Sequence, residues 1–350
     1  MDQYSERLRK IEEELFGLMP EKADASWLPG MTDSLSAEVP PFMIDRFHAP
    51  CLELLKRGGK RWRPLVMVLC CEASGGKAEL AYPLTPLVEM PHNGSLIVDD
   101  IEDKSVERRG GPAVHLVHGE DLSINAGNLM YFNATALLKY QNDLDESLKY
   151  RILEAYCDSL RRLHFGQGLD IQWHNDHESV PDVPVYLQMC RFKTGALARF
   201  AAYAGCLAGG ADTELCLKAA ESWEKAGVGF QILDDVKNLT TGNPGKHRGD
   251  DIVEGKKSLP VILFHRRNPD DFRGFASLMH SAGDKGIETG VEDVEKAIAM
   301  LEDAGTIKEA GEKALVMLKE SLSEIREIFP DKDSAELQCG IIESFIEKML

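Results

Sequence analysis

Three aspartates lie close together in the stretch "SLIVDDIEDKSVERRGGP", which runs from Ser95 to Pro112. Asp99 and Asp103 are four residues apart, so a helix places both carboxylates on one face, one turn apart. Two like charges at this spacing repel each other unless a divalent cation lies between them. Carboxylate oxygens suit Mg²⁺, which usually keeps several waters and takes further oxygens from substrate phosphates. Asp100 points away from that face, and we expect it to support the metal ligands.

A second acidic turn follows an apolar helical approach in "GFQILDDVKNL", where Asp234 and Asp235 are adjacent. A single acidic turn is explained equally well by a solvated helix end, because short acidic motifs match by chance. Two such turns on apolar helices favour a functional site. We expect them to face one another across a cavity and to hold several Mg²⁺ ions and a diphosphate.

A diphosphate also needs basic partners, and the stretch "RGGKRWRPLVMV" offers Lys60, Arg61 and Arg63. Pro64 fits the first turn of a helix, whose free N–H groups and dipole favour an anion. Arg63 suits a bidentate grip on phosphate, whereas Lys60 acts as a point charge. Each further cation alone is more often a surface residue, so the argument rests on their co-occurrence. These further residues are Arg108, Arg109, Lys193 with the adjacent Thr194, Lys246, Lys256 and Lys257.

His92 lies seven residues before Asp99 and therefore on the same helix face. Nearby cations favour the neutral imidazole, which still donates one hydrogen bond. A buried core histidine is the alternative interpretation of this residue.

Helical periodicity dominates the elements that must position these residues, and convincing strand alternation is absent. We interpret residues 27–41 as a loop and residues 243–255 as a polar loop between helices. The pattern predicts one all-α domain over residues 1–350, with an N-terminal helix and loop extension over 1–40 and a core from about 40 onward. After the N-terminal helix, the expected helices cover residues 42–57, 63–74, 79–106, 121–141, 146–166, 184–208, 212–239, 257–265, 290–304, 306–328 and 333–348.

The composition indicates which classes of protein are compatible with this chain. It has 350 residues, 43% of them hydrophobic, which is enough for a large core. The net charge of -18 argues against nucleic acid as the main partner. Long apolar runs are missing, so we expect no membrane span, and the charged N-terminus does not have the pattern of a signal peptide. Eight cysteines without metal-finger spacing indicate reduced thiols in a cytoplasmic protein.

Several blocks resemble, in order, the motifs of the trans-isoprenyl diphosphate synthases, also called polyprenyl synthetases. The blocks are "GGKRWRP", "HNGSLIVDDIEDKSVERRGGP", "GQGLDIQW", "KTGAL", "FQILDDVKN" and "GKHRGDDIVEGKKSLP", over residues 40 to 270. The resemblance implies an all-α isoprenoid-synthase bundle around a deep central cavity, assembled as a homodimer. It also implies Mg²⁺-dependent head-to-tail condensation of an allylic diphosphate with isopentenyl diphosphate. The most similar members are the geranylgeranyl diphosphate synthases.

The resemblance also assigns roles by motif position. Asp99 and Asp103 bind two Mg²⁺ ions and Asp234 binds a third, with Asp100 and Asp235 completing the two acidic motifs. Thr194 and Gln231, together with Lys193, act at the reacting carbons, where the two oxygen dipoles lie beside the developing carbocation. The residues expected on the allylic diphosphate are Arg108, Lys193, Lys246 and Lys256. The residues expected on isopentenyl diphosphate are Lys60, Arg63, His92 and Arg109.

Product length is expected to depend on the helix that carries the first acidic turn. Ser95, Pro91 and Val88 lie one, two and three turns before Asp99, roughly 6, 12 and 16 Å deeper. Family members that stop at fifteen carbons usually carry an aromatic residue near the first two positions. Gly94 and Ser95 are small here, which favours twenty carbons or slightly more. The alternatives are that these small residues only allow close helix packing, and that Met130, Tyr131 or Phe132 stops the chain.

The chain departs from the family pattern at two places. The second acidic motif ends in Asn238 instead of aspartate, and Pro91 lies inside a helix, where it favours a kink.

Three alternative functions remain open. A farnesyl or longer-chain synthase differs only in product length. A class I terpene cyclase does not need the isopentenyl diphosphate residues, and a silent partner subunit usually lacks acidic-motif residues.

Overall fold

The computed structural model describes residues 3–22, 27–32, 36–142, 144–176, 179–242, 247–287 and 289–347. Helices form almost all of the regular structure in these ranges, which confirms the all-α prediction. The chain divides into two compact units, which are described separately. Unit 1 comprises Met1–Leu160, Phe200–Ala219 and Phe329–Ala335, and unit 2 comprises Arg161–Arg199, Ala220–Ile328 and Glu336–Leu350. The expectation of a single domain stays a prediction.

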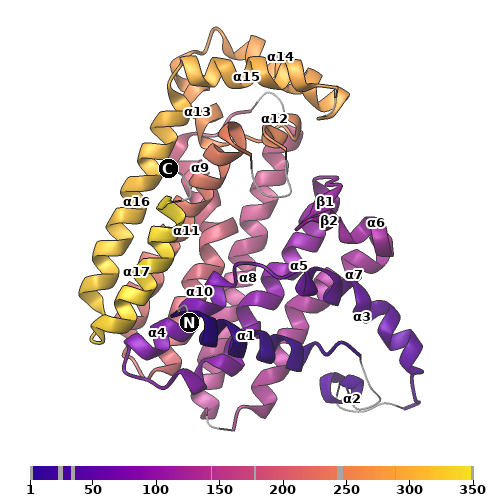
Figure 1. The fold of residues 1–350 in the computed structure, drawn as a ribbon, viewed down its shortest axis with the longest axis vertical. Helices are drawn as coiled ribbons and strands as arrows, with labels where there is room; N and C mark the ends of the chain where they lie inside the picture. Colours follow the sequence, from indigo (N-terminus) through magenta and orange to yellow (C-terminus); the bar gives the residue numbers. More distant parts are fainter. Residues whose placement is uncertain are drawn as a thin grey trace. The chain divides into compact units, whose positions relative to one another are not determined.

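Unit 1 contains the N-terminal helices, the first acidic turn and a short hairpin (Figure 1). It also holds the first half of α8 (Glu146–Asn175), most of α10 (Ala196–Ala208) and the start of α11 (Thr213–Thr240). Its other elements are α1 (Ser5–Leu18), α2 (Trp27–Thr32), α3 (Pro41–Lys56), α4 (Trp62–Ala73), η1 (Ala78–Leu80), η2 (Tyr82–Leu84), α5 (Pro86–Glu102), β1 (Glu107–Arg108), β2 (Gly111–Pro112), α6 (Val114–His118), α7 (Glu120–Asn133) and η3 (Ala134–Tyr140).

The core of unit 1 is built around α4 and around the contact between α5 and α7. Helix α4 is apolar on all sides and almost wholly buried, as expected for a helix in the centre of a bundle. Gly94 and Gly127 let α5 and α7 approach closely, because a Cβ at Gly94 would lie 2.6 Å from the Gly127 carbonyl oxygen. This contact supports close helix packing as the reason for the small residue at position 94.

Gly94→Ala is expected to destabilise the protein by about 1–3 kcal/mol, because the added methyl meets backbone on the facing helix. Urea unfolding measures this loss. Gly274→Ala is the matched control, since a Cβ at this exposed position in α14 meets nothing within 4 Å. The control should gain up to about 1 kcal/mol from helix propensity. Equal stability of both variants would refute the packing role of Gly94.

Helix α1 belongs to the core of unit 1, although the resemblance gives the first forty residues no role. Ile11, Leu15 and Met19 are fully buried. Arg7 pairs with Glu72 of α4 through two bonds, Nε to Oε2 at 2.9 Å and Nη2 to Oε1 at 3.0 Å. The N-terminal extension therefore stabilises the helix that follows the basic loop.

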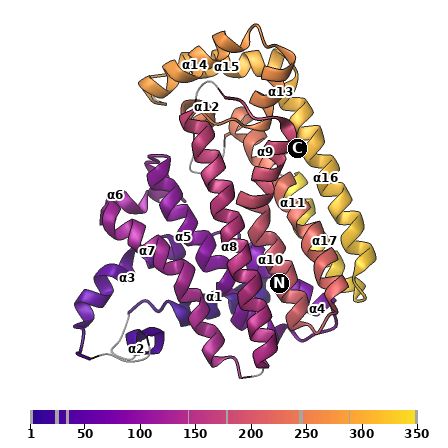
Figure 2. The same ribbon diagram turned by 180° about the vertical axis from the view of Figure 1, so that it is seen from behind.

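Unit 2 contains the second acidic turn and the C-terminal helices. Figures 1 and 2 show α16 and α17 side by side, and Arg326 of α16 donates to Glu336 and Glu343 of α17. Its elements, besides the remaining parts of α8, α10 and α11, are α9 (Val183–Cys190), η4 (Arg191–Gly195), α12 (Asp250–Val253), α13 (Leu259–Arg267), α14 (Phe272–Lys285), α15 (Val291–Asp303), α16 (Thr306–Ile328) and all but the first turn of α17 (Lys332–Glu347).

Some expected boundaries are wrong. The helix expected from residue 79 begins only at Pro86, after two 3₁₀ turns, because Pro83 and Pro86 lack the N–H that a continuous helix needs. Residues 27–32 of the expected loop form α2, where the Trp27 Nε1–H donates to the Leu18 carbonyl oxygen at 3.0 Å. The polar loop over 243–255 includes the short helix α12, and the helix expected over 184–208 contains the π-helical turn η4. Helices α6 and α14 were not predicted.

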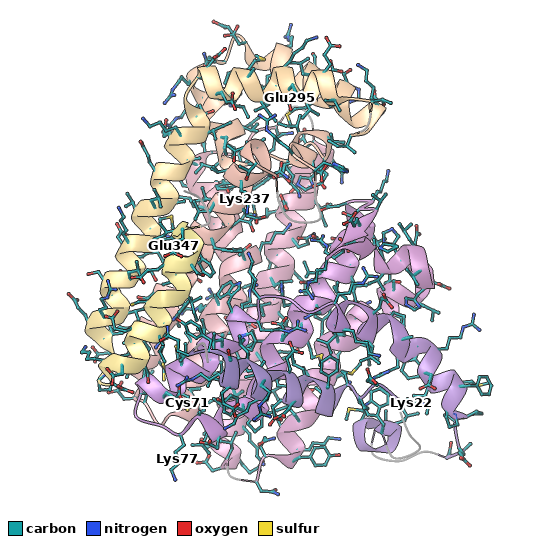
Figure 3. The ribbon with its side chains drawn as sticks, in the orientation of Figure 1. Lys22, Cys71, Lys77, Lys237, Glu295 and Glu347 are labelled. Atoms are coloured by element: carbon teal, nitrogen blue, oxygen red, sulfur yellow. The ribbon has the colours of Figure 1, made fainter. Side chains whose placement is uncertain are left out.

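All eight cysteines are free thiols, and seven of them are buried, as the sequence predicts. The Cys71 thiol donates to the Lys77 carbonyl oxygen at 3.2 Å, and both residues are labelled in Figure 3. None of the helices in the described ranges has the length and apolarity needed to cross a membrane.

Candidate active site

The first acidic turn forms the C-terminal end of α5. The Asp103 N–H donates to the Asp99 carbonyl oxygen at 2.8 Å, which places the two residues one helical turn apart, as predicted. Both side chains are half-exposed. Asp100 is fully buried, and Arg108 Nε donates to its Oδ1 at 2.8 Å. Arg108 Nη2 also lies 3.8 Å from Asp99 Oδ2, so this arginine ties the acidic turn to the hairpin.

The hairpin of β1 and β2 holds Arg108 and Arg109 beside this turn. Arg57 supports it by donating to the carbonyl oxygens of Arg108 and Pro112 at 2.9 and 2.7 Å. Arg109 has a φ of 52° and donates to the Leu54 carbonyl oxygen at 3.1 Å and to Asn93 Oδ1 at 2.9 Å. Burial lowers the pKa of Arg109 to about 10. Both arginines are thus fixed by unit 1 at the end of α5.

The cations of the basic loop before α4 lie in different environments. Arg61 is 3% exposed and donates to Glu89 at 2.7 Å and to Glu12 at 2.6 Å. It is therefore held in a buried ion pair. Lys60 is exposed, and Arg63 lies over the Trp62 ring at 4.3 Å from its centroid.

His92 is half-exposed on α5, on the side that carries Asp99. Burial and the positive charges of Arg63 and Arg109 hold its pKa well below the ordinary value. The neutral imidazole stays a prediction, and the lowered pKa favours it.

The second acidic turn lies on α11 in unit 2. Asp234 is exposed, whereas Asp235 is 7% exposed and accepts two hydrogen bonds. The Tyr186 hydroxyl donates to Asp235 Oδ2 at 2.6 Å, and Gln231 Nε2 donates to Oδ1 at 2.8 Å. Burial, with the nearby charge of Asp251, raises the pKa of Asp235 to about 7.

Lys193 and Thr194 lie in the π-helical turn η4, a feature that often occurs at functional sites. Lys193 Nζ pairs with Asp170 Oδ2 at 2.5 Å, and His174 Nε2 lies 2.9 Å from Asp170 Oδ1. Burial alone would raise the pKa of Asp170, but these two partners hold it well below the ordinary value. The turn packs closely on α8, because a Cβ at Gly166 would lie 2.3 Å from the Lys193 nitrogen.

Asp170, His174 and Tyr186 were not singled out from the sequence. A signal existed for the first two residues, because Asp170 and His174 are spaced i, i+4 on one helix face and Asp170 lies in the block "GQGLDIQW". Tyr186 gave no signal, since it stands among the apolar residues of α9.

The loop after α12 carries Lys256, which pairs with Asp251 at 3.3 Å and with Glu254. Asn238, the unusual end of the second motif, is fully buried, and its Oδ1 accepts the Asp251 N–H at 3.2 Å. Asparagine at this position thus tethers the start of α12 to α11. Lys246 lies outside the described residues.

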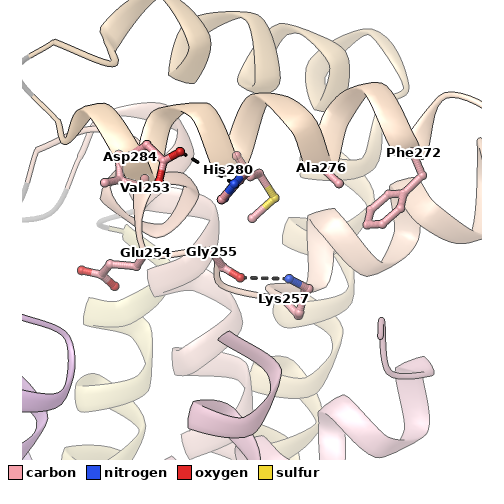
Figure 4. Close-up of a pocket in the computed structure, with 10 residues that line it drawn as sticks. Val253, Glu254, Gly255, Lys257, Phe272, Ala276, His280 and Asp284 are labelled. Atoms are coloured by element: carbon pink, nitrogen blue, oxygen red, sulfur yellow. Dashed lines mark hydrogen bonds and ion pairs between the residues drawn. The ribbon is translucent and has the colours of Figure 1, made fainter. Parts of the chain in front are cut away.

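A cavity of about 200 Å³ lies between the end of α12 and α14 (Figure 4). Its lining includes Lys257, whose ammonium donates to the Gly255 carbonyl oxygen at 3.1 Å and whose pKa is lowered by burial. Phe272 and Met279 give it apolar walls. Lys257 is among the basic residues singled out from the sequence, but the residues assigned by motif position to metal or diphosphate do not line this cavity.

The residues expected to control product length all lie on α5 in unit 1. Val88, Pro91 and Gly94 are buried, and the half-exposed Ser95 donates its hydroxyl to the His92 carbonyl oxygen at 2.9 Å. Met130 and Tyr131 of α7 are buried as well, whereas Phe132 is 73% exposed. Of the three residues considered for stopping the growing chain inside unit 1, Phe132 is therefore the least suitable.

The acidic turns fit hard divalent cations by the type of their donors. In the part of the chain that the structure describes, no three acidic, histidine or cysteine side chains form a preformed metal cage. Half-exposed carboxylates that leave other positions to water and phosphate oxygens suit Mg²⁺ better than zinc. Asp99 and Asp103 are half-exposed, and Asp234 is exposed.

Comparisons with known proteins give the same picture. The polyprenyl synthetase family model matches residues 44–300. A geranylfarnesyl diphosphate synthase of Aeropyrum pernix is 32% identical over 87% of this chain and 95% of its own length. A geranylgeranyl diphosphate synthase of Methanosarcina mazei is 35% identical over 76% of this chain and 79% of its own length.

The solved structure of a geranylgeranyl pyrophosphate synthetase from Pyrococcus horikoshii superposes with a TM-score of 0.83 at 28% identity, over 99% of this chain and 97% of that one. The likeness includes the N-terminal helices. With the acidic turns and the basic loop in family order, the chain belongs to the polyprenyl synthetase family and is a trans-prenyltransferase.

Proposed function

We propose that this chain is a Mg²⁺-dependent synthase that condenses isopentenyl diphosphate head-to-tail with allylic diphosphates, with geranylgeranyl diphosphate as its main product. The relatives of similar length are named geranylgeranyl or geranylfarnesyl diphosphate synthases, which supports a product of this size. The reaction class follows from family membership, and the residue roles below are part of the proposal.

One observation carries the assignment of the metal residues. Each acidic turn pairs an accessible leading aspartate with a buried second aspartate that is held by protein donors. Asp99 is half-exposed beside the buried Asp100, and Asp234 is exposed beside the buried Asp235. A metal–diphosphate site needs accessible carboxylates that bind the metal. It also needs buried carboxylates that hold the metal-binding turn in place.

Mg²⁺ ions held at this site, about three by the family pattern, would neutralise the charge of the leaving diphosphate. Asp99, Asp103 and Asp234 hold these ions, and Asp100 and Asp235 keep the turns in place. Lys193, Lys256 and Arg108 bind the allylic diphosphate, and we extend this set to Lys246 by motif position. Lys60, Arg63 and Arg109 bind isopentenyl diphosphate, and the neutral His92 donates one hydrogen bond to it.

The carbon chemistry needs no protein nucleophile. The allylic C–O bond breaks, the electron pair leaves with diphosphate, and the double bond of isopentenyl diphosphate attacks the allylic cation. The departed diphosphate then takes the proton that restores the double bond. The oxygens of Thr194 and Gln231 stabilise the cation by their dipoles.

Product analysis tests this function. The purified protein is incubated with Mg²⁺, labelled isopentenyl diphosphate and, in separate tubes, C5, C10 or C15 allylic diphosphates, and the released alcohols are sized by chromatography. A dominant C20 alcohol supports the proposal. A C15 end point keeps the reaction class and refutes the product. A cyclic hydrocarbon, or no incorporation with any primer, indicates a cyclase or a silent subunit.

Ser95→Phe is expected to shift the product toward C15, because an aromatic ring one turn before Asp99 fills the space expected for the growing chain. The alcohol profile of the variant measures the shift. Leu96→Phe is the control, since the next residue points about 100° away around the helix and should leave the profile unchanged. An unchanged profile in Ser95→Phe would place the stop on another helix.

We also propose a homodimer formed through unit 1. Exposed apolar side chains on α6, α7 and α8 support this proposal, and they are Leu116, Val117, Ile124, Phe132 and Tyr150. Covering this face on a second copy explains the 73% exposure of Phe132. Light scattering at micromolar concentration tests it, and the mass of a single chain would refute the dimer.

A further inference from the structure

Four buried or half-buried side chains of unit 2 form a continuous chain of hydrogen bonds from Tyr186 to Thr194. The Tyr186 hydroxyl donates to Asp235 Oδ2 at 2.6 Å, and Gln231 Nε2 donates to Asp235 Oδ1 at 2.8 Å. The Thr194 hydroxyl donates to Gln231 Oε1 at 2.6 Å. The chain joins α9, α11 and η4, and Tyr186 at its origin is 1% exposed.

The donor and acceptor types give this chain one direction. The Gln231 amide nitrogen carries only donors, so it donates to Asp235 Oδ1, and the Tyr186 hydroxyl donates to Asp235 Oδ2. The amide nitrogen of Gln231 is therefore held at Asp235, and its carbonyl oxygen must point to Thr194. This oxygen accepts the Thr194 proton, which leaves the lone pairs of Thr194 Oγ1 as the face presented to other groups.

We propose that Tyr186 is a positioning residue, which acts through Asp235 to fix the amide orientation of Gln231 and to keep the Thr194 hydroxyl proton away from the substrate. The proposal rests on the proposed function, in which the Thr194 and Gln231 oxygens lie beside an allylic cation. A hydroxyl that turned its proton toward that cation would destabilise it, whereas fixed lone pairs stabilise it without reorganisation.

The same geometry separates the two aspartates of the second motif. Asp234 is exposed, whereas both oxygens of Asp235 are used by Tyr186 and Gln231. We therefore assign Asp235 to orientation and Asp234 to metal binding.

Tyr186→Phe tests the proposal, because it removes only the hydroxyl from the buried ring. Without this donor the Asp235 carboxylate can rotate, and the amide of Gln231 is no longer held in one orientation. We expect kcat for condensation to fall about tenfold or more, while KM for both diphosphates and the Mg²⁺ dependence stay within about twofold. Asp235→Asn should give the same pattern, whereas a metal ligand at this position would raise the Mg²⁺ requirement.

Ser321→Ala is the matched control, because it also removes one fully buried hydroxyl of unit 2. Ser321 of α16 donates to the Ser222 carbonyl oxygen at 2.8 Å and is not connected to the chain from Tyr186. The control should lose a similar amount of thermal stability and keep kcat. An equal loss of kcat in both variants would show that Tyr186 acts only through stability and would overturn the proposal.

Inhibitor binding gives a second readout that does not depend on turnover. An allylic diphosphate analogue with an ammonium at the cationic carbon should bind Tyr186→Phe about tenfold more weakly than the wild type. The thiolo analogue of similar shape, which keeps the diphosphate but has no positive charge, should bind both proteins equally. Equal weakening for both analogues, or for neither, would overturn the proposal. A wild-type protein that forms no prenyl diphosphate would instead refute the proposed function.

Discussion

Asp99→Ala is expected to lower kcat by about a thousandfold or more and to leave the fold intact. Asp99 is half-exposed at the end of α5, so its removal does not leave a buried charge unpaired. The loss falls on turnover, because the variant can no longer hold the cation that neutralises the leaving diphosphate. Steady-state kinetics at saturating Mg²⁺ measures the loss, and circular dichroism checks the helix content.

Glu102→Ala on the same helix turn is the control for this experiment. Glu102 carries the same charge and is exposed, and its side chain projects about 100° around the helix axis from that of the adjacent Asp103. This variant should keep most of the wild-type turnover, so a general loss of negative charge cannot explain the effect. Near-normal turnover of Asp99→Ala would contradict the metal assignment.

Arg61→Ala is expected to destabilise the protein by about 3–5 kcal/mol, the largest loss of stability that we anticipate. Glu89 is 2% exposed and pairs with Arg61 at 2.7 Å. Truncation leaves this carboxylate buried with Asn93 Nδ2, at 3.0 Å, as its remaining side-chain donor. Glu12 of α1 loses its 2.6 Å partner as well, so the contact between α1 and the basic loop weakens.

Urea unfolding of Arg61→Ala and Arg9→Ala separates the buried pair from an exposed one. Arg9 also has two glutamate partners, Glu6 and Glu13, but its side chain is 54% exposed, so its removal should change stability little. The additional change Glu89→Gln should restore part of the stability of Arg61→Ala, because it removes the buried charge. Similar unfolding midpoints for the two arginine variants would contradict the structural role of Arg61.

Much of the fold could be predicted from local pattern. Helix α4 and the C-terminal helices α15 to α17 lie within a few residues of the expected ranges, because their apolar spacing is strong. The start of α5 was misplaced, since the apolar residues from position 79 continue through two prolines that end regular hydrogen bonding. Helix α2 could not be predicted, because it is held by the contacts of Trp27 with Leu18 and His48 and not by helix propensity.

The sequence by itself determined the reaction class and the residues that can carry it. Acidic turns, basic loops and their order are local features, so they can be recognised without knowledge of the fold. The tertiary structure decided which of these residues touch other parts of the protein. It placed Arg61 in a buried ion pair, Gly94 against α7 and Asp235 at the centre of a hydrogen-bond chain that begins at Tyr186. Such partners lie tens of residues apart in the chain, and their proximity depends on packing that no short motif encodes.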